Sequence, residues 1–152
     1  MSETRQALTA DIGRAVQRYQ RSVQAFDDAV GRRLGLGPAD LRCLDWLTDG
    51  PMSAGRLSAA TGLKPAATTA LLDRLEGRGL VERFRDDRDR RVVLVRMTPK
   101  AAEQIAAMYQ PMVQEGQTLF EGLTDHDLAV MRDYLDVCTA LTDRHRTRVT
   151  GA

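Results

Sequence analysis

The side chains best suited to chemistry in this sequence are arginines in a short, highly charged stretch. Residues 86–91 read Asp-Asp-Arg-Asp-Arg-Arg and include Arg88, Arg90 and Arg91. A guanidinium group presents several N–H donors in a rigid planar fork, which matches the geometry of phosphate oxygens. An arginine at the tip of a hairpin can also enter a narrow, A·T-rich minor groove, where the negative potential is strongest. This stretch therefore predicts binding to nucleic acid.

Some charges in the same stretch are expected to shape the loop instead. An aspartate repels phosphate, so Asp86 and Asp89 are expected to form pairs inside the loop. Arg91 is open to either role, an internal pair or a contact with DNA. Arg88 and Arg90 are the residues expected at the tip, in contact with DNA. The alternative is a solvated charged hairpin that binds nothing.

The charged stretch lies between two segments that predict β-strands. Residues 80–85 alternate apolar and polar side chains, as a half-buried strand does. Residues 92–97 form a second run, rich in β-branched side chains. Two such strands joined by a polar loop predict a β-hairpin.

The segment before the hairpin predicts two short helices joined by a tight turn. Ser53 is a capping residue and is expected to open a helix that ends near residue 60. Residues 61–64 contain a glycine and predict the turn. Pro65 suits the first position of the next helix, which is expected to end at about Arg78. This helix-turn-helix followed by a hairpin predicts a winged helix.

The second of these helices is expected to bury one face and present the other to a DNA major groove, which is wide enough for one helix. The spacing of Thr68, Leu71, Leu72 and Leu75 predicts the buried face. Small side chains dominate the opposite face, beside Asp73, so we expect sparse reading of bases and more reliance on phosphates and DNA shape. The residues expected to contact DNA outside the hairpin are Ser53, Lys64, Ala66, Ala67, Thr69, Ala70 and Arg74.

The charge distribution supports the same interpretation. The 152-residue chain has a net charge of only +1. Residues 54–100 nevertheless hold 11 Lys or Arg against 6 Asp or Glu, whereas the remaining residues hold 11 against 15. The basic excess coincides with the predicted helix-turn-helix and hairpin, as expected of a protein that binds a duplex.

Several other classes of protein are disfavoured by composition. The apolar runs are too short to span a membrane, and the first residues lack a secretory h-region, so we expect a cytoplasmic protein. No nucleophile elbow, P-loop or dinucleotide motif occurs, and we expect no catalytic residues, cofactor or metal site. Cys43 and Cys138 lie on apolar helical stripes and are expected to be buried reduced thiols, with a redox role as the alternative.

Long helices are expected at both ends of the chain. Apolar residues recur at steps of three and four between residues 4 and 34, and again after Thr98 and after Thr124. Pro111 should kink the middle one of these helices, and the polar residues 143–148 are expected to fray. A single winged helix cannot cover such stripes, so we expect a second copy of the chain to cover them.

The segment LSAATGLKPAATTALLDRLEGRGLVER, followed by DDRDRRVVLVRMTPKA, closely resembles the MarR family of bacterial transcription regulators. The charged loop carries that family's Asp-x-Arg-x-x-Arg pattern as Asp86, Arg88 and Arg91. The resemblance implies a mainly α fold with a small β-hairpin wing in a single domain. Residues 1–37 and 99–148 would form dimerisation helices, and residues 38–98 the winged helix-turn-helix. Lys64 and Ala70 depart from the capping and longer polar residues that many relatives carry there.

The same resemblance implies a homodimeric regulator of a pseudo-palindromic operator in double-stranded DNA, most simply a repressor. A small-molecule effector, aromatic or phenolic in the family, would release it from DNA. The residues expected to line the effector pocket are Tyr19, Phe26, Trp46, Met108 and Met112, for which ordinary core packing is the alternative. The competing hypothesis is a winged-helix module for protein interaction that does not bind DNA directly.

Overall fold

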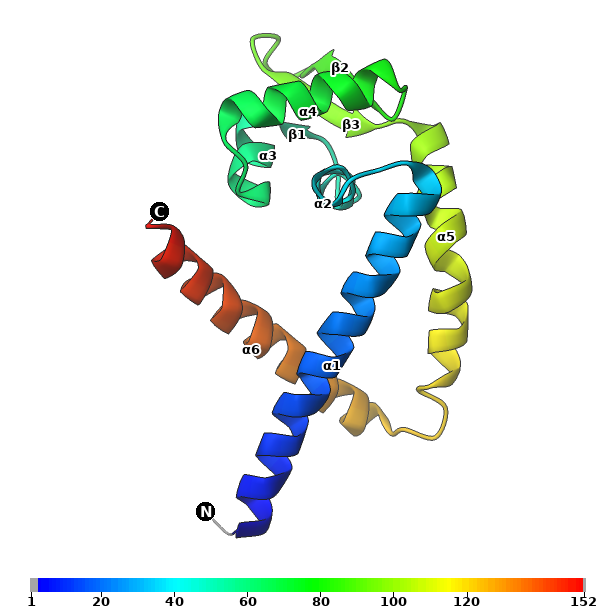
Figure 1. Cartoon of the computed structure of the whole chain (residues 1–152), viewed down its shortest axis with the longest axis vertical. Helices are drawn as coiled ribbons and strands as arrows, with labels where there is room; N and C mark the ends of the chain where they lie inside the picture. Colours follow the sequence, from blue (N-terminus) through cyan, green and yellow to red (C-terminus); the bar gives the residue numbers. More distant parts are fainter. Residues whose placement is uncertain (1–2, 152) are drawn as a thin grey trace. The chain divides into compact units, whose positions relative to one another are not determined.

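The computed structural model describes residues 3–151, which form mainly helices and one small sheet (Figure 1). The predicted fold class, mainly α with a β-hairpin wing, is confirmed. In chain order the elements are α1 Glu3–Leu34, α2 Pro38–Trp46, β1 Met52–Ser53, α3 Ala54–Thr61, α4 Pro65–Gly77, β2 Val81–Arg85, β3 Val93–Met97, α5 Pro99–Thr118 and α6 Asp125–Thr150.

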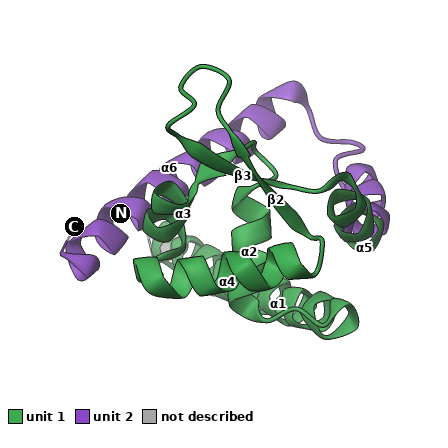
Figure 2. Cartoon of the chain, turned by 90° about the horizontal axis from the view of Figure 1, so that it is seen from above, with its two compact units in different colours: residues 1–108 green, residues 109–152 purple. Residues whose placement is uncertain are grey.

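The chain divides into two compact units, and the boundary between them along the sequence falls within α5 (Figure 2). The first unit extends to Met108 and contains the helix-turn-helix and the whole sheet. The second unit begins at Tyr109 and contains the rest of α5 together with α6.

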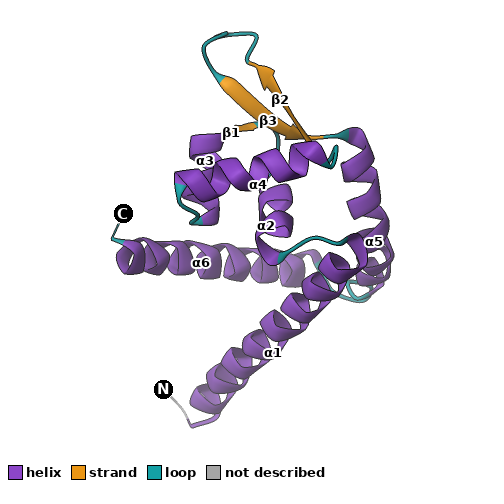
Figure 3. Ribbon diagram, turned by 45° about the horizontal axis from the view of Figure 1, so that its top comes forward, coloured by secondary structure: helices purple, strands orange, loops and turns teal. Residues whose placement is uncertain are grey.

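The core of the first unit lies between the sheet and the helices α2, α3 and α4. The sheet is antiparallel in the order β1-β3-β2, with Val81 opposite Met97 and Met52 opposite Val95. Apolar side chains from the helices and strands form one buried cluster, whose fully buried members include Leu44, Leu57, Leu72, Leu75, Val81 and Val95. This cluster fixes α4 against the hairpin, which extends beyond the helices of the same unit (Figure 3).

The helix-turn-helix forms as its sequence predicts. The Ser53 hydroxyl oxygen accepts a hydrogen bond from the Arg56 N–H at 3.3 Å and caps α3. Gly62 ends α3 in the left-handed region at φ +73°, which favours glycine. Pro65 is the first residue of α4, and the buried side chains of that helix are Thr68, Leu71, Leu72 and Leu75, the predicted inward face.

The hairpin is joined to its neighbours by specific backbone contacts. After α4 the chain turns at Gly79, at φ +68°, and the Leu80 N–H donates to the Leu75 carbonyl at 2.9 Å. After β3, Thr98 caps α5, because its hydroxyl oxygen accepts from the Ala101 N–H at 3.2 Å. The same hydroxyl donates to the Gly79 carbonyl at 2.8 Å and so ties both ends of the hairpin together.

Most of α1 is exposed along its apolar stripe. The first three-quarters of the helix exposes large apolar side chains, including Leu8, Ile12, Tyr19 and Val23. Only near its end does α1 pack on the rest of its unit, where Val30 is buried. There the Arg78 guanidinium donates to the Leu34 and Gly35 carbonyls at 2.9 and 2.7 Å, which satisfies acceptors at the helix end.

The second unit is exposed along its length, and no described side chain of α6 is buried. The predicted cap is confirmed, because Thr124 and Asp127 form a reciprocal capping box. Pro111 lies inside α5, and the kink expected there stays a prediction. The expected fraying of residues 143–148 is wrong: α6 continues to Thr150 and ends at Gly151, at φ +69°. Glycine in this conformation is a common helix end, so Gly151 is the local signal for where α6 stops.

Candidate nucleic-acid interface

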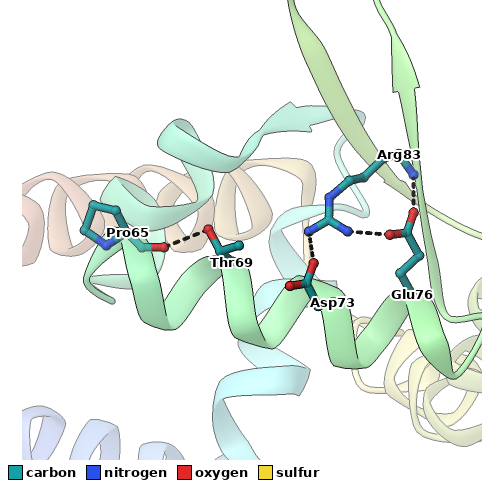
Figure 4. Close-up of polar contacts among 5 residues, drawn as sticks. All are labelled: Pro65, Thr69, Asp73, Glu76 and Arg83. Atoms are coloured by element: carbon teal, nitrogen blue, oxygen red, sulfur yellow. Dashed lines mark hydrogen bonds and ion pairs between the residues drawn. The ribbon is translucent and has the colours of Figure 1, made fainter.

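The exposed face of α4 consists of the residues that the sequence predicts. Ala66, Ala67, Thr69 and Ala70 are all exposed in the first two turns of the helix. The Thr69 hydroxyl donates to the Pro65 carbonyl at 3.1 Å (Figure 4). Its oxygen therefore keeps lone pairs for an incoming donor, whereas its proton is engaged within the helix. The side chains of this face are short, which allows close approach to a DNA groove.

Lys64 stands at the start of α4 as the N-cap residue, and its side chain makes no capping hydrogen bond. The helix N-terminus presents backbone N–H groups and a partial positive charge, both of which favour an anion. The exposed Lys64 ammonium group adds a full charge at the same end. This end of α4 is therefore suited to a phosphate. Ser53, by contrast, is half-buried and occupied in capping α3.

The wing loop is shaped by its own aspartates, as predicted. The Asp86 carboxylate accepts from the Arg88 N–H at 3.0 Å. The Asp89 carboxylate accepts from the Arg91 N–H at 3.0 Å and from its Nε at 3.2 Å. These bonds from Arg91, the backbone bond first, lower the pKa of Asp89 below its usual value. Arg91 therefore has the internal role that the sequence left open, and its contact with DNA stays a prediction.

Arg88 and Arg90 carry the charge that the loop leaves available. Both side chains are exposed, and within residues 3–151 neither guanidinium has a hydrogen-bond or ion-pair partner. The loop around them is held by Arg85 on β2, whose Nη1 donates to the Arg90 carbonyl at 2.7 Å. A restrained loop loses less conformational entropy on binding, which favours contact with a polyanion.

Arg74 has a partner that the sequence did not predict. Its guanidinium forms an ion pair with Asp40 on α2, and the Asp40 side chain is only 7% exposed. The Asp40 carboxylate also accepts from the Gly37 N–H at 2.9 Å. Arg74 thus holds α2 to α4. Its side chain is still 54% exposed, so part of it stays accessible to DNA. Its contact with DNA stays a prediction.

Arg83 on β2 was missed by the sequence analysis. It reaches back to α4, where its Nη2 lies 2.6 Å from the Asp73 carboxylate and its Nη1 pairs with the Glu76 carboxylate (Figure 4). Its backbone N–H also donates to Glu76 at 3.1 Å. Burial opposes the charged form, but the bonds to Asp73 and Glu76 outweigh it and raise the Arg83 pKa. No local sequence pattern indicates this pairing, because the two carboxylates lie seven and ten residues away and come within reach only when β2 packs beside α4.

The residues predicted to line an effector pocket are not brought together within the first unit. Tyr19 is 70% exposed on α1, and Met112, in the second unit, is exposed as well. Phe26 and Met108 are half-buried. Trp46 lines a hollow of about 300 Å³, whose other lining residues are Asp49, Gly50, Pro51, Met52 and Arg56. The effector site stays a prediction.

The cysteines differ from each other in their surroundings. Cys43 is buried as predicted, and burial raises the pKa of its thiol to about 11. Cys138 is half-buried on α6, so the expectation that it is fully buried is wrong for the single chain.

No group of three His, Cys, Asp or Glu side chains in residues 3–151 is arranged to hold a metal ion. In the same range, no helix has both the length and the apolar character needed to cross a membrane.

Comparison with known proteins agrees with this architecture. A model of the MarR family matches residues 34–92. The uncharacterized HTH-type transcriptional regulator YcgE of Bacillus subtilis (strain 168) is 32% identical over 82% of this chain and 81% of its own. The HTH-type transcriptional repressor MdtR of the same organism is 27% identical, over 87% of this chain and 76% of MdtR. A MarR family protein from Bacillus stearothermophilus has a similar structure, with a TM-score of 0.69, 23% identity and coverage of 94% and 99%.

The fold and the basic, exposed wing define a winged helix-turn-helix protein, and its relatives are transcriptional regulators rather than enzymes. The chain belongs to the MarR family of DNA-binding transcriptional regulators. The resemblance noted in the sequence of the helix-turn-helix and wing is thereby confirmed.

Proposed function

We propose that this protein is a homodimeric repressor that binds a pseudo-palindromic operator through α4 and the wing of each protomer. The observation that carries this proposal is the contrast within the wing loop. Asp86, Asp89 and Arg91 are paired internally, whereas Arg88 and Arg90 extend from the loop without partners among the described residues. Repression is proposed by analogy with MdtR, which is named a repressor.

The DNA-binding surface would combine the first turns of α4 with the wing. Lys64 and the N-terminus of α4 would bind a phosphate, and Ala66, Ala67, Thr69 and Ala70 would face the base edges. The methyl groups of alanine and threonine suit thymine methyls, but they read few other features. Sequence preference would then depend largely on DNA shape, including the width of the minor groove at the wing.

Dimerisation is supported by the apolar surfaces that each unit leaves exposed. In the first unit these lie along α1, and in the second they surround an apolar hollow of about 500 Å³ lined by Phe120, Leu128, Met131, Arg132, Leu135 and Asp136. Exposed apolar area of this extent on long helices favours association. We assign residues 1–37 and 99–148 to dimerisation and residues 38–98 to DNA binding. A two-fold dimer would place its recognition helices roughly 34–36 Å apart, one turn of DNA.

The test of DNA binding is a salt titration of the variant Arg88→Ala/Arg90→Ala. Each lost phosphate contact should reduce the slope of log K against log salt by about one, and the affinity for every duplex should fall. The matched control is Arg18→Ala/Arg21→Ala, which removes two exposed charges from α1 that, like those of the wing, have no partner among the described residues. Wild-type affinity and slope in the wing variant would remove the wing from the interface.

Dimerisation is tested by Val23→Asp and Leu135→Asp, which place charges on the exposed apolar stripes of α1 and α6. Sedimentation of the double variant should show monomers that bind a palindromic duplex weakly. A persistent dimer would contradict the assignment of these stripes.

An effector is proposed on the resemblance to the family, with an aromatic or phenolic compound as its class. The hollow beside Trp46 offers one ring and the Arg56 side chain as possible contacts. Trp46 is the single tryptophan of the chain, so its fluorescence reports on this hollow alone. Quenching by phenol that saturates, and that is lost in Arg56→Ala or accompanied by release of DNA, would support a site here. A linear, unsaturable response would exclude it.

A further inference from the structure

Arg83 connects the wing to the recognition helix through two carboxylates. Its guanidinium bonds to Asp73 at 2.6 Å and to Glu76, and its N–H donates to Glu76 at 3.1 Å (Figure 4). Asp73 and Glu76 lie three residues apart and therefore on one side of α4. The Arg83 side chain is only 26% exposed, whereas that of Asp73 is 62% exposed. The arginine is therefore less accessible to solvent than either carboxylate, and it reaches both from β2 (Figure 4).

On a helix that approaches DNA, these carboxylates would weaken binding, because they repel phosphates. Both lie in the second half of α4, where the helix dipole is also negative. The one basic side chain of that half, Arg74, has its guanidinium engaged by Asp40. Without Arg83, two unpaired negative charges would therefore lie on a surface that must come close to phosphates, and each would repel them.

We propose that Arg83 is a positioning residue of the DNA interface, one that neutralises Asp73 and Glu76 and holds them against the wing without itself contacting DNA. This inference rests on the proposed function, because it takes α4 and the wing as the DNA-binding surface. Arg83 lets the recognition helix carry acidic residues while its first two turns approach the groove.

The guanidinium is the group that this arrangement requires. Its planar fork reaches two acceptors at once, with Nη1 on one carboxylate and Nη2 on the other. A lysine ammonium is a compact point charge and would reach one carboxylate well. Arg83→Lys should therefore recover only part of the effect of Arg83→Met on DNA binding.

The test is a double-mutant cycle between Arg83→Met and Asp73→Asn/Glu76→Gln, read out by fluorescence anisotropy with a labelled duplex at low salt. Arg83→Met alone should weaken binding by about tenfold, the size expected of two carboxylates brought near phosphates in a partly solvated interface. In the Asp73→Asn/Glu76→Gln background the same change should weaken binding by less than about threefold. The matched control is Arg96→Met, which removes an equal charge from β3, where Arg96 pairs with Glu82 at 2.7 Å, away from α4.

Equal losses on Arg83→Met in the two backgrounds would overturn the inference, because Arg83 would then act directly on DNA or only through the fold. Thermal unfolding separates the last case. The Asp73 and Glu76 side chains are 62% and 41% exposed, so solvent screens their pairs with Arg83, and Tm should stay within about 4 °C. If Arg83→Met does not fold, the Asp73→Asn/Glu76→Gln protein decides by itself, since it should bind at least as tightly as wild type. Weaker binding by Asp73→Asn/Glu76→Gln would mean that these carboxylates contact DNA themselves, and it would overturn the inference. Absence of duplex binding by wild type, in contrast, would refute the proposed function rather than this inference.

Discussion

Arg74 allows a direct choice between a role in DNA binding and a role in the fold. Its position on the exposed side of α4 predicts a DNA contact, yet its guanidinium is paired with Asp40. Arg74→Met keeps much of the apolar stem and removes the charge. The Asp40 carboxylate would then retain the Gly37 N–H, at 2.9 Å, as its remaining partner among the described residues.

The magnitude follows from the unequal exposure of the two partners. A hydrogen bond to a charged group contributes about 1.5–3 kcal/mol, and breaking a fully buried ion pair costs about 3–5 kcal/mol. The Arg74 side chain is 54% exposed, so solvent screens the pair and water can replace the guanidinium at Asp40. We therefore expect Arg74→Met to lower the free energy of unfolding by about 1.5 kcal/mol, near the lower end of the first range.

The assay combines urea unfolding with a salt titration of DNA binding. Unfolding is compared at one protein concentration, since association would make stability depend on concentration. In the Asp40→Asn background the amide oxygen still accepts from Gly37, and Arg74→Met should then cost less than about 0.5 kcal/mol. The slope of log K against log salt should stay unchanged, unlike the decrease of about one expected for Arg88→Ala.

The opposite pattern would refute this reasoning. If Arg74→Met unfolds like wild type while the salt slope becomes shallower by about one, Arg74 binds a phosphate and its pair with Asp40 contributes nothing measurable. Equal losses in the Asp40→Asn and wild-type backgrounds would also separate Arg74 from Asp40.

Three further outcomes are expected. Leu72 is 0% exposed, so Leu72→Ala should cost about 2–5 kcal/mol in urea unfolding, and a loss below about 1 kcal/mol would contradict its place in the core. The pKa of Cys43, raised to about 11, keeps its thiol protonated at pH 8, so mass spectrometry should find iodoacetamide on Cys138 first. Bonds from the Thr124 side chain and then its N–H lower the pKa of Asp127, so its stabilising effect is present above the unfolded pKa and is lost as pH falls through the folded one. Thr124→Ala should weaken that dependence in thermal melts between pH 2 and 5, and an unchanged profile would argue against the capping box.

Local patterns in the sequence were enough to predict the elements of the DNA-binding lobe. The four buried residues of α4 follow a helical period, and β2 and β3 follow from alternation and β-branching. The capping roles of Ser53 and Thr124 follow from side chains that bond to N–H groups three residues on. Each of these features depends on neighbours within one or two turns, so the residue order alone contains them.

The sequence determined which basic residues belong to the interface region, but only the tertiary structure decided which of them keep their charge available. Arg74 lies 34 residues from Asp40, and Arg83 reaches Asp73 only because β2 packs beside α4. Arg88 and Arg90 extend from the loop while Arg91 folds back on Asp89. A long side chain pairs with whichever carboxylate the packed core brings within about 3 Å, and that proximity is set by how the elements pack against one another rather than by their order along the chain.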